Sequence, residues 1–135
     1  MPTKKSNDTK IAIPSFGKDI DSEINPRFGR CEYFLIFNQD GKLVKSISNT
    51  GAEARRGAGV SAAQSLAEQK VKAVIAGNIG PNAYVVLNSA GIEIFSGALG
   101  MNAEEAFKAW KGGKLTKVEK SPAFQSGFSR GRRFD

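Results

Sequence analysis

The 135-residue sequence predicts a single α/β domain built on a mixed β-sheet. Short runs rich in β-branched and aromatic residues indicate strands, and two strand–turn–helix units follow a stretch with a hairpin pattern. The resulting order of elements is β-β-β-α-β-α-β-α. Strands joined by a short turn pair antiparallel, whereas strands joined through a helix pair parallel. We therefore expect a five-stranded sheet with an antiparallel hairpin in one half and parallel strands in the other.

The first three strands are expected between residues 10 and 48. Lys10–Pro14 is an apolar run that ends at a proline, and residues 15–30 have no sustained periodicity, which indicates a long loop. Tyr33–Phe37 and Leu43–Ser48 have strand composition and are separated by a short polar turn, so they predict a β-hairpin. The segment Asn49–Gly51 is expected to be a turn.

Helices and strands are expected to alternate after residue 59. Ser61 and Gln64 have the spacing of a capping box, which places the start of a first helix. The apolar stripe of this helix is expected to comprise Val60, Ala63, Ala67 and Val71, with Leu66 beside it. Ala73–Ala76 then predicts a buried strand.

Two further helices have terminal signals of their own. Pro81 suits the first position of a helix, and Gly91 suits the position after its end. Ile92–Phe95 predicts the last strand, and Asn102 with Glu105 predicts the capped start of a third helix. The inner faces are expected to be formed by Ala83, Val86, Leu87 and Ala90, and by Ala103, Ala106, Phe107 and Trp110.

Composition restricts the possible function. Hydrophobic residues make up 40% and charged residues 24%, no apolar run reaches the ~20 residues of a membrane span, and no secretory signal is visible, so we expect a cytoplasmic protein. The chain has one cysteine, Cys31, and no histidine. One chain therefore has too few side chains for the usual zinc, haem or four-thiolate iron–sulfur sites, and histidine-based catalysis is excluded.

The positive charge is concentrated near the C-terminus. Residues 111–135 contain seven basic and two acidic residues, so they carry +5 of the total net charge of +7. We expect residues 1–9 to be a flexible N-terminus, residues 10–116 to be the domain and residues 117–135 to be a flexible basic tail. A tail with arginine, glycine and phenylalanine can bind RNA or another polyanion, which is one hypothesis for the function.

The turn after the strand Ala73–Ala76 suggests a different function. Glycines at Gly77 and Gly80 lead from a buried strand into a helix, and a helix N-terminus presents free backbone N–H groups that suit an anion. The loop 15–30 and the turn Gly97–Gly100 also follow strands. Because the carboxyl ends of strands in such sheets gather at one edge, we expect a ligand site there.

Three motifs occur in a recognisable order: the segment Pro26–Phe34, the segment Gly77–Ala83, and a final short helix followed by Gly113-Lys114-Leu115. With these motifs the sequence resembles the dinitrogenase iron–molybdenum cofactor biosynthesis family, and the resemblance covers roughly Lys10 to Leu115. It implies a three-layer domain of ribonuclease H-like topology. Where several members have a His-Gly pair before the first helix, this chain has Arg56-Gly57.

The resemblance implies noncovalent binding of a metal–sulfur cluster, either the iron–molybdenum cofactor, one of its precursors, or another molybdenum, iron or copper sulfide. It implies a non-catalytic carrier or scaffold that works with cluster donor and acceptor proteins. The ribonuclease H-like topology also suggests a nuclease, but two-metal cleavage requires clustered carboxylates, and the first strand has none. Glu104 and Glu105 lie at a helix start, where capping explains them.

Three segments are candidates for the walls of the cluster site. In the first, Arg27 and Arg30 can neutralise an anion, and Cys31 can supply a thiolate for metal, whereas Phe28, Gly29 and Cys31 can equally be a core plug, a turn and a buried thiol. In the second, Arg56 and Gly57 form a basic segment or a plain solvated loop. In the third, Gly77, Asn78, Gly80 and Asn82 hold an anion or form a tight connector. The sequence leaves the oligomeric state open.

Overall fold

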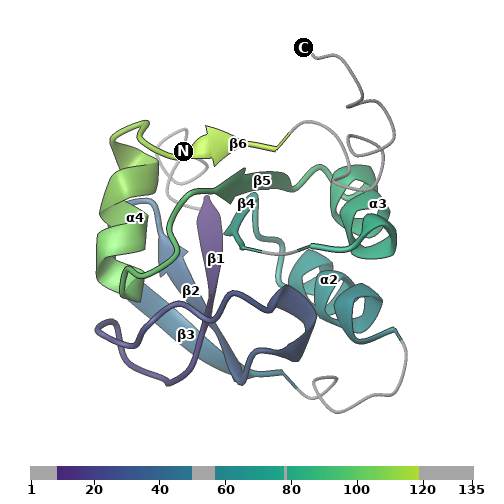
Figure 1. The fold of residues 1–135 in the computed structure, drawn as a ribbon, viewed down its shortest axis with the longest axis horizontal. Helices are drawn as coiled ribbons and strands as arrows, with labels where there is room; N and C mark the ends of the chain where they lie inside the picture. Colours follow the sequence, from purple (N-terminus) through teal and green to yellow (C-terminus); the bar gives the residue numbers. More distant parts are fainter. Residues whose placement is uncertain (1–8, 50–56, 78, 119–135) are drawn as a thin grey trace, which may run out of the picture.

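The fold was analysed in a computed structural model, which describes residues 9–49, 57–77 and 79–118 of the chain. Three layers are visible in Figure 1: helix α4 lies on one side of a central sheet, and helices α2 and α3 lie on the other. None of the helices in these described ranges is long and apolar enough to cross a membrane.

The sheet has six strands in the order β3-β2-β1-β4-β5-β6. The strands are β1 (Lys10–Ser15), β2 (Tyr33–Asn38), β3 (Leu43–Ser48), β4 (Ala73–Ile75), β5 (Glu93–Ser96) and β6 (Thr116–Lys117). Strands β1, β4 and β5 are parallel, whereas β2 pairs antiparallel with β1 and β3 pairs antiparallel with β2. The expected mixed sheet, with a hairpin half and a parallel half, is confirmed.

Within the described residues the sheet has six strands, one more than the five that were expected. The additional strand, β6, pairs antiparallel with β5, and just beyond it the Val118 N–H donates to the carbonyl of Ile94 at 2.7 Å. Only two residues form this strand and both are exposed, so the sequence has no alternation of apolar and polar residues that could reveal it.

The helical segments are a 3₁₀ turn, η1 (Phe28–Arg30), and the helices α2 (Ala58–Glu68), α3 (Pro81–Ser89) and α4 (Ala103–Lys111). Two apolar cores lie on opposite faces of the sheet. Phe28, Leu66 and Leu87 belong to the core beneath α2 and α3, whereas Phe37 and Phe107 belong to the core beneath α4, with their rings stacked 5.5 Å apart.

The start of α2 differs from the expectation. The helix begins at Ala58, three residues before Ser61, and its N-cap is Gly57 in the left-handed region with φ of 73°. The Ser61 N–H donates to the Gly57 carbonyl at 2.8 Å, so Ser61 already lies inside the helix and the predicted capping box was wrong.

The earlier start also changes the inner face of α2. Its buried residues are Ala58, Ala62, Ala63 and Leu66, and the helix ends before Val71. Of the stripe that the sequence predicted, Ala63 is buried, whereas Val60 and Ala67 are only partly buried. A left-handed glycine can start a helix without an apolar or capping pattern, which is why the sequence did not mark this start.

The signals at the other helices are confirmed. Pro81 is the first residue of α3, and Gly91 follows its end with a positive φ of 76°. At α4, the Glu105 N–H donates to the Asn102 side chain at 2.8 Å, and the Asn102 N–H donates to the Glu105 carboxylate at 3.0 Å. This reciprocal pair is the predicted capping box.

The segment 15–30 is more ordered than a plain loop. Its backbone forms isolated bridges from Ser15 to Ile24 and from Glu23 to Asn102, and the Asn25 N–H donates to the Pro14 carbonyl at 3.0 Å. These contacts attach the segment to the end of β1 and to the start of α4. They hold the η1 turn at the carboxyl end of the parallel strands, where the sequence predicts a ligand site.

Candidate functional site

The structure brings together parts of all three segments that the sequence selected. A pocket of about 430 Å³ lies where η1, the start of α2 and the start of α3 meet. Its described lining comprises Arg27, Phe28, Gly29, Arg30, Gly57, Ala58, Gly59, Val60, Gly80, Pro81, Asn82 and Ala83. We call this the three-segment pocket. Its volume falls within the roughly 300–1,000 Å³ range that is typical of small-ligand sites.

Small residues allow the three segments to approach each other. A Cβ at Gly29 would lie 2.6 Å from the Gly59 amide nitrogen, which is closer than any real contact, so η1 packs backbone to backbone against α2. A Cβ at Gly59 would lie 3.3 Å from the Cβ of Ala83 on α3. Side chains larger than hydrogen at Gly29 or Gly59 would push the pocket walls apart.

Two helix N-termini face the three-segment pocket. The first turns of α2 and α3 contain the amides of Gly59, Val60, Asn82 and Ala83, which have no acceptor inside their helices. The N-cap residues are Gly57 and Gly80, which have no side chain for capping, and neither first turn contains an acidic residue. The first turns therefore present uncompensated partial positive charge to the pocket.

Helix α4, whose N-terminus is not part of this pocket, shows the opposite pattern. Its start has a complete capping box, and Glu104 and Glu105 lie in its first turn. Among the described residues, the first turn of α4 therefore contains carboxylates of its own, whereas the first turns of α2 and α3 contain none.

Two arginines add full positive charges to this pocket. Arg27 and Arg30 are exposed and flank the buried Phe28, and no acidic residue is among the described lining residues. The Arg27 backbone N–H donates to the Asn25 side chain at 2.9 Å, which fixes the start of η1. A guanidinium group offers several N–H donors in one plane, which suits an anion with several acceptor atoms.

Phe28 is a core residue that also belongs to the described lining of the pocket. Its side chain is only 1% exposed, and its ring centroid lies 5.3 Å from that of Phe34. The side chain of Phe28 therefore has the position that the core interpretation predicted. This packing fixes the η1 turn on the sheet and so places the two arginines.

Cys31 lies in the core and does not line the pocket. Its side chain has no exposed surface, its thiol donates to the Phe28 carbonyl at 3.5 Å, and burial raises its pKa to about 12. A metal needs the thiolate, which this environment disfavours. The sequence left open whether Cys31 is a ligand or a core residue, and the geometry favours the core residue.

The remaining residues that the sequence selected do not all line the pocket. Gly77 is not part of the described lining; a Cβ at this position would lie 2.9 Å from the Cδ2 atom of Leu99 and 3.1 Å from the backbone of Pro26, so the space around it is tight. Gly80 has an ordinary φ of −74° and open space around its Cβ position. Arg56 and Asn78 lie outside the described residues.

Sequence reasoning missed one residue near the site. The Asn49 side-chain amide donates to the carbonyl of Gly29 at 3.1 Å and to the carbonyl of Cys31 at 2.9 Å. The sequence predicted only a turn here. No local pattern could have revealed these bonds because the partners are 20 and 18 residues away along the chain.

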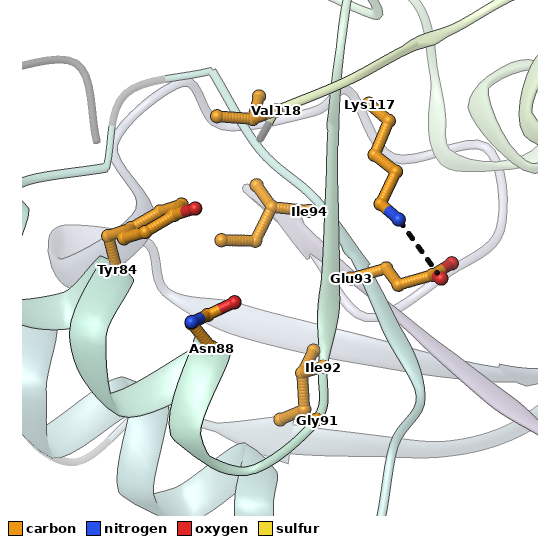
Figure 2. A pocket seen from close by; sticks show the side chains of 8 residues that line it. All are labelled: Tyr84, Asn88, Gly91, Ile92, Glu93, Ile94, Lys117 and Val118. Carbon is orange, nitrogen blue, oxygen red and sulfur yellow. Dashed lines mark hydrogen bonds and ion pairs between the residues drawn. The ribbon is translucent and has the colours of Figure 1, made fainter. Parts of the chain in front are cut away.

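A second pocket of about 360 Å³ lies between α3, β5 and β6. Figure 2 shows Tyr84 and Asn88 projecting from α3 toward Ile94, with Lys117 paired to Glu93 at 3.4 Å on the other side of β5. None of the three sequence-selected segments contributes to it. It has a carboxylate in its wall and no helix N-terminus, so the three-segment pocket is the better candidate for an anion site.

The described lining of the three-segment pocket lacks the side chains that usually bind a metal ion directly. It has no cysteine, methionine, aspartate or glutamate, and the chain has no histidine. Across the part of the chain that the structure describes, no three such side chains are grouped to hold a metal ion. The described lining is therefore better suited to an anion held by hydrogen bonds and charge than to a free metal cation.

Comparison with known proteins connects this geometry to one family. Residues 9–113 match the family described as dinitrogenase iron-molybdenum cofactor. An uncharacterised protein of Methanocaldococcus jannaschii is 37% identical over 114 residues, which cover 82% of this chain and 92% of the relative.

Two solved structures are also similar. The apo form of the orange protein from Desulfovibrio gigas matches with a TM-score of 0.80 and 26% identity, over 84% of this chain and 95% of that protein. A putative NifB protein from Thermotoga matches with a TM-score of 0.72 and 35% identity, over 84% of this chain and 98% of that protein. Sequence and fold agree over most of the chain, and the chain belongs to the dinitrogenase iron-molybdenum cofactor family.

Proposed function

We propose that this protein is a non-catalytic carrier or scaffold for an anionic metal–sulfur cluster, which it binds in the three-segment pocket during cluster assembly or storage. The observation that carries the proposal is the convergence on one pocket of Arg27, Arg30 and two helix N-termini whose first turns contain no acidic residue. Membership of the dinitrogenase iron-molybdenum cofactor family supports a cluster as the anion.

The contacts would be made to the outer atoms of the cluster. Sulfide atoms on the surface of a metal–sulfur cluster carry negative charge and accept hydrogen bonds, and the pocket offers guanidinium groups and first-turn amides as donors. The described lining has no thiol or carboxylate that could replace a sulfide on the metal. We therefore expect a cluster whose metal sites are already fully coordinated, bound without a covalent link.

Reversible binding of this kind suits a carrier. Each exposed helix N-terminus contributes roughly 0.3–1 kcal/mol per charge, and a hydrogen bond to a charged group contributes roughly 1.5–3 kcal/mol. Several such contacts hold an anion without the very slow release of direct metal–thiolate bonds. A donor protein and an acceptor protein for the cluster are the partners that this function implies.

No catalytic role is proposed. The described lining lacks a carboxylate, a thiol and an imidazole, so it has no general base or activated nucleophile of the usual kinds. The alternative of RNA or polyanion binding depends on the predicted tail, residues 117–135, of which 119–135 lie outside the described residues. The comparisons give this alternative no support.

The proposal is tested by anaerobic purification of the full chain, followed by visible absorbance and elemental analysis for Fe, Mo, Cu and S. The purified protein is then titrated with tetrathiomolybdate, a coloured dianion whose metal is saturated with sulfide. We expect the wild-type protein to bind the probe, and Arg27→Ala and Arg30→Ala each to weaken binding by roughly 10- to 100-fold.

Two variants serve as controls. Lys114→Ala removes one positive charge from an exposed residue beyond the end of α4, and Cys31→Ala removes the buried thiol. Both are expected to bind the probe as the wild type does. Protein that stays colourless and does not bind the probe, or arginine variants that bind it as well as Lys114→Ala, would contradict the proposal.

A further inference from the structure

Asn49 fixes the backbone on both sides of Arg30. Its side-chain amide donates to the carbonyl of Gly29 at 3.1 Å and to the carbonyl of Cys31 at 2.9 Å. The same nitrogen lies 3.8 Å from the sulfur of Cys31. The two N–H donors of the amide thus match the two carbonyl groups that flank Arg30.

Asn49 is itself attached to the sheet. Its backbone N–H donates to the Glu32 carbonyl at 3.0 Å, which extends the antiparallel pairing of Tyr33 with Ser48 by one more bond. The side chain therefore starts from a rigid position at the ends of β2 and β3. Through its two hydrogen bonds it attaches η1 to the sheet, and η1 is the wall of the three-segment pocket that contains Arg30.

Asn49 does not line the three-segment pocket, so it is not expected to touch a ligand there. A residue with these contacts can influence binding through the geometry of the η1 wall. The Arg30 side chain is exposed, and its guanidinium must reach a particular position to hold an anion in the pocket. A fixed backbone at Arg30 limits the positions from which the side chain starts, so less backbone ordering is needed when the anion binds.

We propose that Asn49 is a positioning residue for Arg30: by holding the Gly29 and Cys31 carbonyls it keeps the Arg30 guanidinium aimed at the anion in the three-segment pocket. The effect of Asn49 on anion binding rests on the proposed function. The structural part of the proposal, the control of the η1 backbone by Asn49, is independent of any ligand.

The binding part is tested with a double-mutant cycle in which the probe is tetrathiomolybdate. We expect Asn49→Ala to weaken binding by roughly tenfold in the wild-type background and by less than about twofold in the Arg30→Ala background. The two effects are not additive because Asn49 acts through Arg30. An equal loss in both backgrounds would overturn the proposal.

Asn38→Ala is the matched control. The Asn38 side chain also holds two backbone groups, since its oxygen accepts from Asp40 N–H at 2.9 Å and from Lys42 N–H at 3.1 Å. It lies at the opposite end of β2 from the pocket. We expect it to lower the free energy of unfolding without changing the affinity for the probe; a loss of affinity equal to that of Asn49→Ala would show a general effect of destabilisation and overturn the proposal.

The structural part is measured without ligand by ¹⁵N NMR relaxation and amide hydrogen exchange at residues 29–31. We expect greater mobility there in Asn49→Ala and no change in Asn38→Ala. Unchanged mobility in Asn49→Ala would overturn the positioning role. Failure of the wild-type protein to bind the probe, with mobility changed as expected, would instead contradict the proposed function and leave the structural role of Asn49 supported.

Discussion

Gly29 and Gly59 lie in direct backbone contact, so that a Cβ built on Gly29 would be 2.6 Å from the Gly59 amide nitrogen and 2.7 Å from its Cα. This contact joins the η1 turn to the first turn of α2 and thereby forms two walls of the three-segment pocket. The contact joins residues 30 positions apart in the chain and requires that Gly29 has no Cβ.

Two glycine substitutions separate packing from ligand contact. We expect Gly29→Ala to lower the free energy of unfolding by about 1–3 kcal/mol, because the new methyl group collides with the backbone of Gly59. Gly80→Ala should change it by less than about 0.5 kcal/mol, because φ is ordinary there and nothing lies within 4 Å. Urea unfolding of both variants measures the difference.

The affinity of Gly80→Ala for tetrathiomolybdate is the second measurement in this comparison. Gly80 lines the pocket, so a methyl group at this position is expected to weaken binding although it leaves stability unchanged. Comparable destabilisation by Gly80→Ala and Gly29→Ala would contradict the geometry of the two turns.

Salt should weaken anion binding. Arg27 and Arg30 are exposed, so their attraction for an anion is screened as ionic strength rises, with a Debye length of about 10 Å at 0.1 M and about 3 Å at 1 M. We expect the affinity for tetrathiomolybdate to fall steadily from 0.05 to 1 M NaCl and the slope to be smaller in Arg27→Ala. An affinity that is independent of salt would indicate that charge does not drive binding.

The buried thiol of Cys31 should make the fold less stable in alkali. Burial raises its pKa from 9.0 to about 12, so as pH rises the unfolded chain releases the thiol proton before the folded protein does. The contribution of this group is therefore fully present below pH 9 and is lost progressively between pH 9 and pH 12.

Cys31→Ala provides the comparison for this prediction. We expect the difference in unfolding free energy between the wild type and this variant to be constant from pH 6 to about pH 8.5 and then to change in favour of the variant. The other titrating groups are the same in both proteins and cancel in the difference. A constant difference up to pH 11 would show that the thiol titrates equally in the folded and unfolded chains.

The capping box of α4 should stabilise the fold without affecting the site. Asn102→Ala removes the acceptor of the Glu105 N–H and is expected to cost about 1 kcal/mol, measured as a lower midpoint in urea. Because α4 lies on the opposite face of the sheet from α2 and α3, binding of tetrathiomolybdate should be unchanged (Figure 1). Weaker binding in this variant would indicate that the two faces are coupled.

The sequence by itself determined the features that depend on short-range signals. Strand composition on both sides of a short polar turn identified the hairpin of β2 and β3, Pro81 marked the start of α3, and the Asn102–Glu105 spacing marked the capping box of α4. Each of these signals lies within a few residues of the element that it specifies. The family was likewise visible in the order of the motifs, and the match over residues 9–113 confirms it.

Features that depend on contacts between residues distant in the sequence became visible only in the folded structure. Four such features have no signature in the neighbouring sequence. They are the start of α2 at Ala58, the burial of Cys31, the close contact of Gly29 with Gly59, and the bonds of Asn49 to the η1 turn. Backbone proximity, desolvation and hydrogen-bond partners arise only when the sheet has assembled. The sequence thus determined which segments could form an anion site, and the packing of those segments decided which of their residues line it.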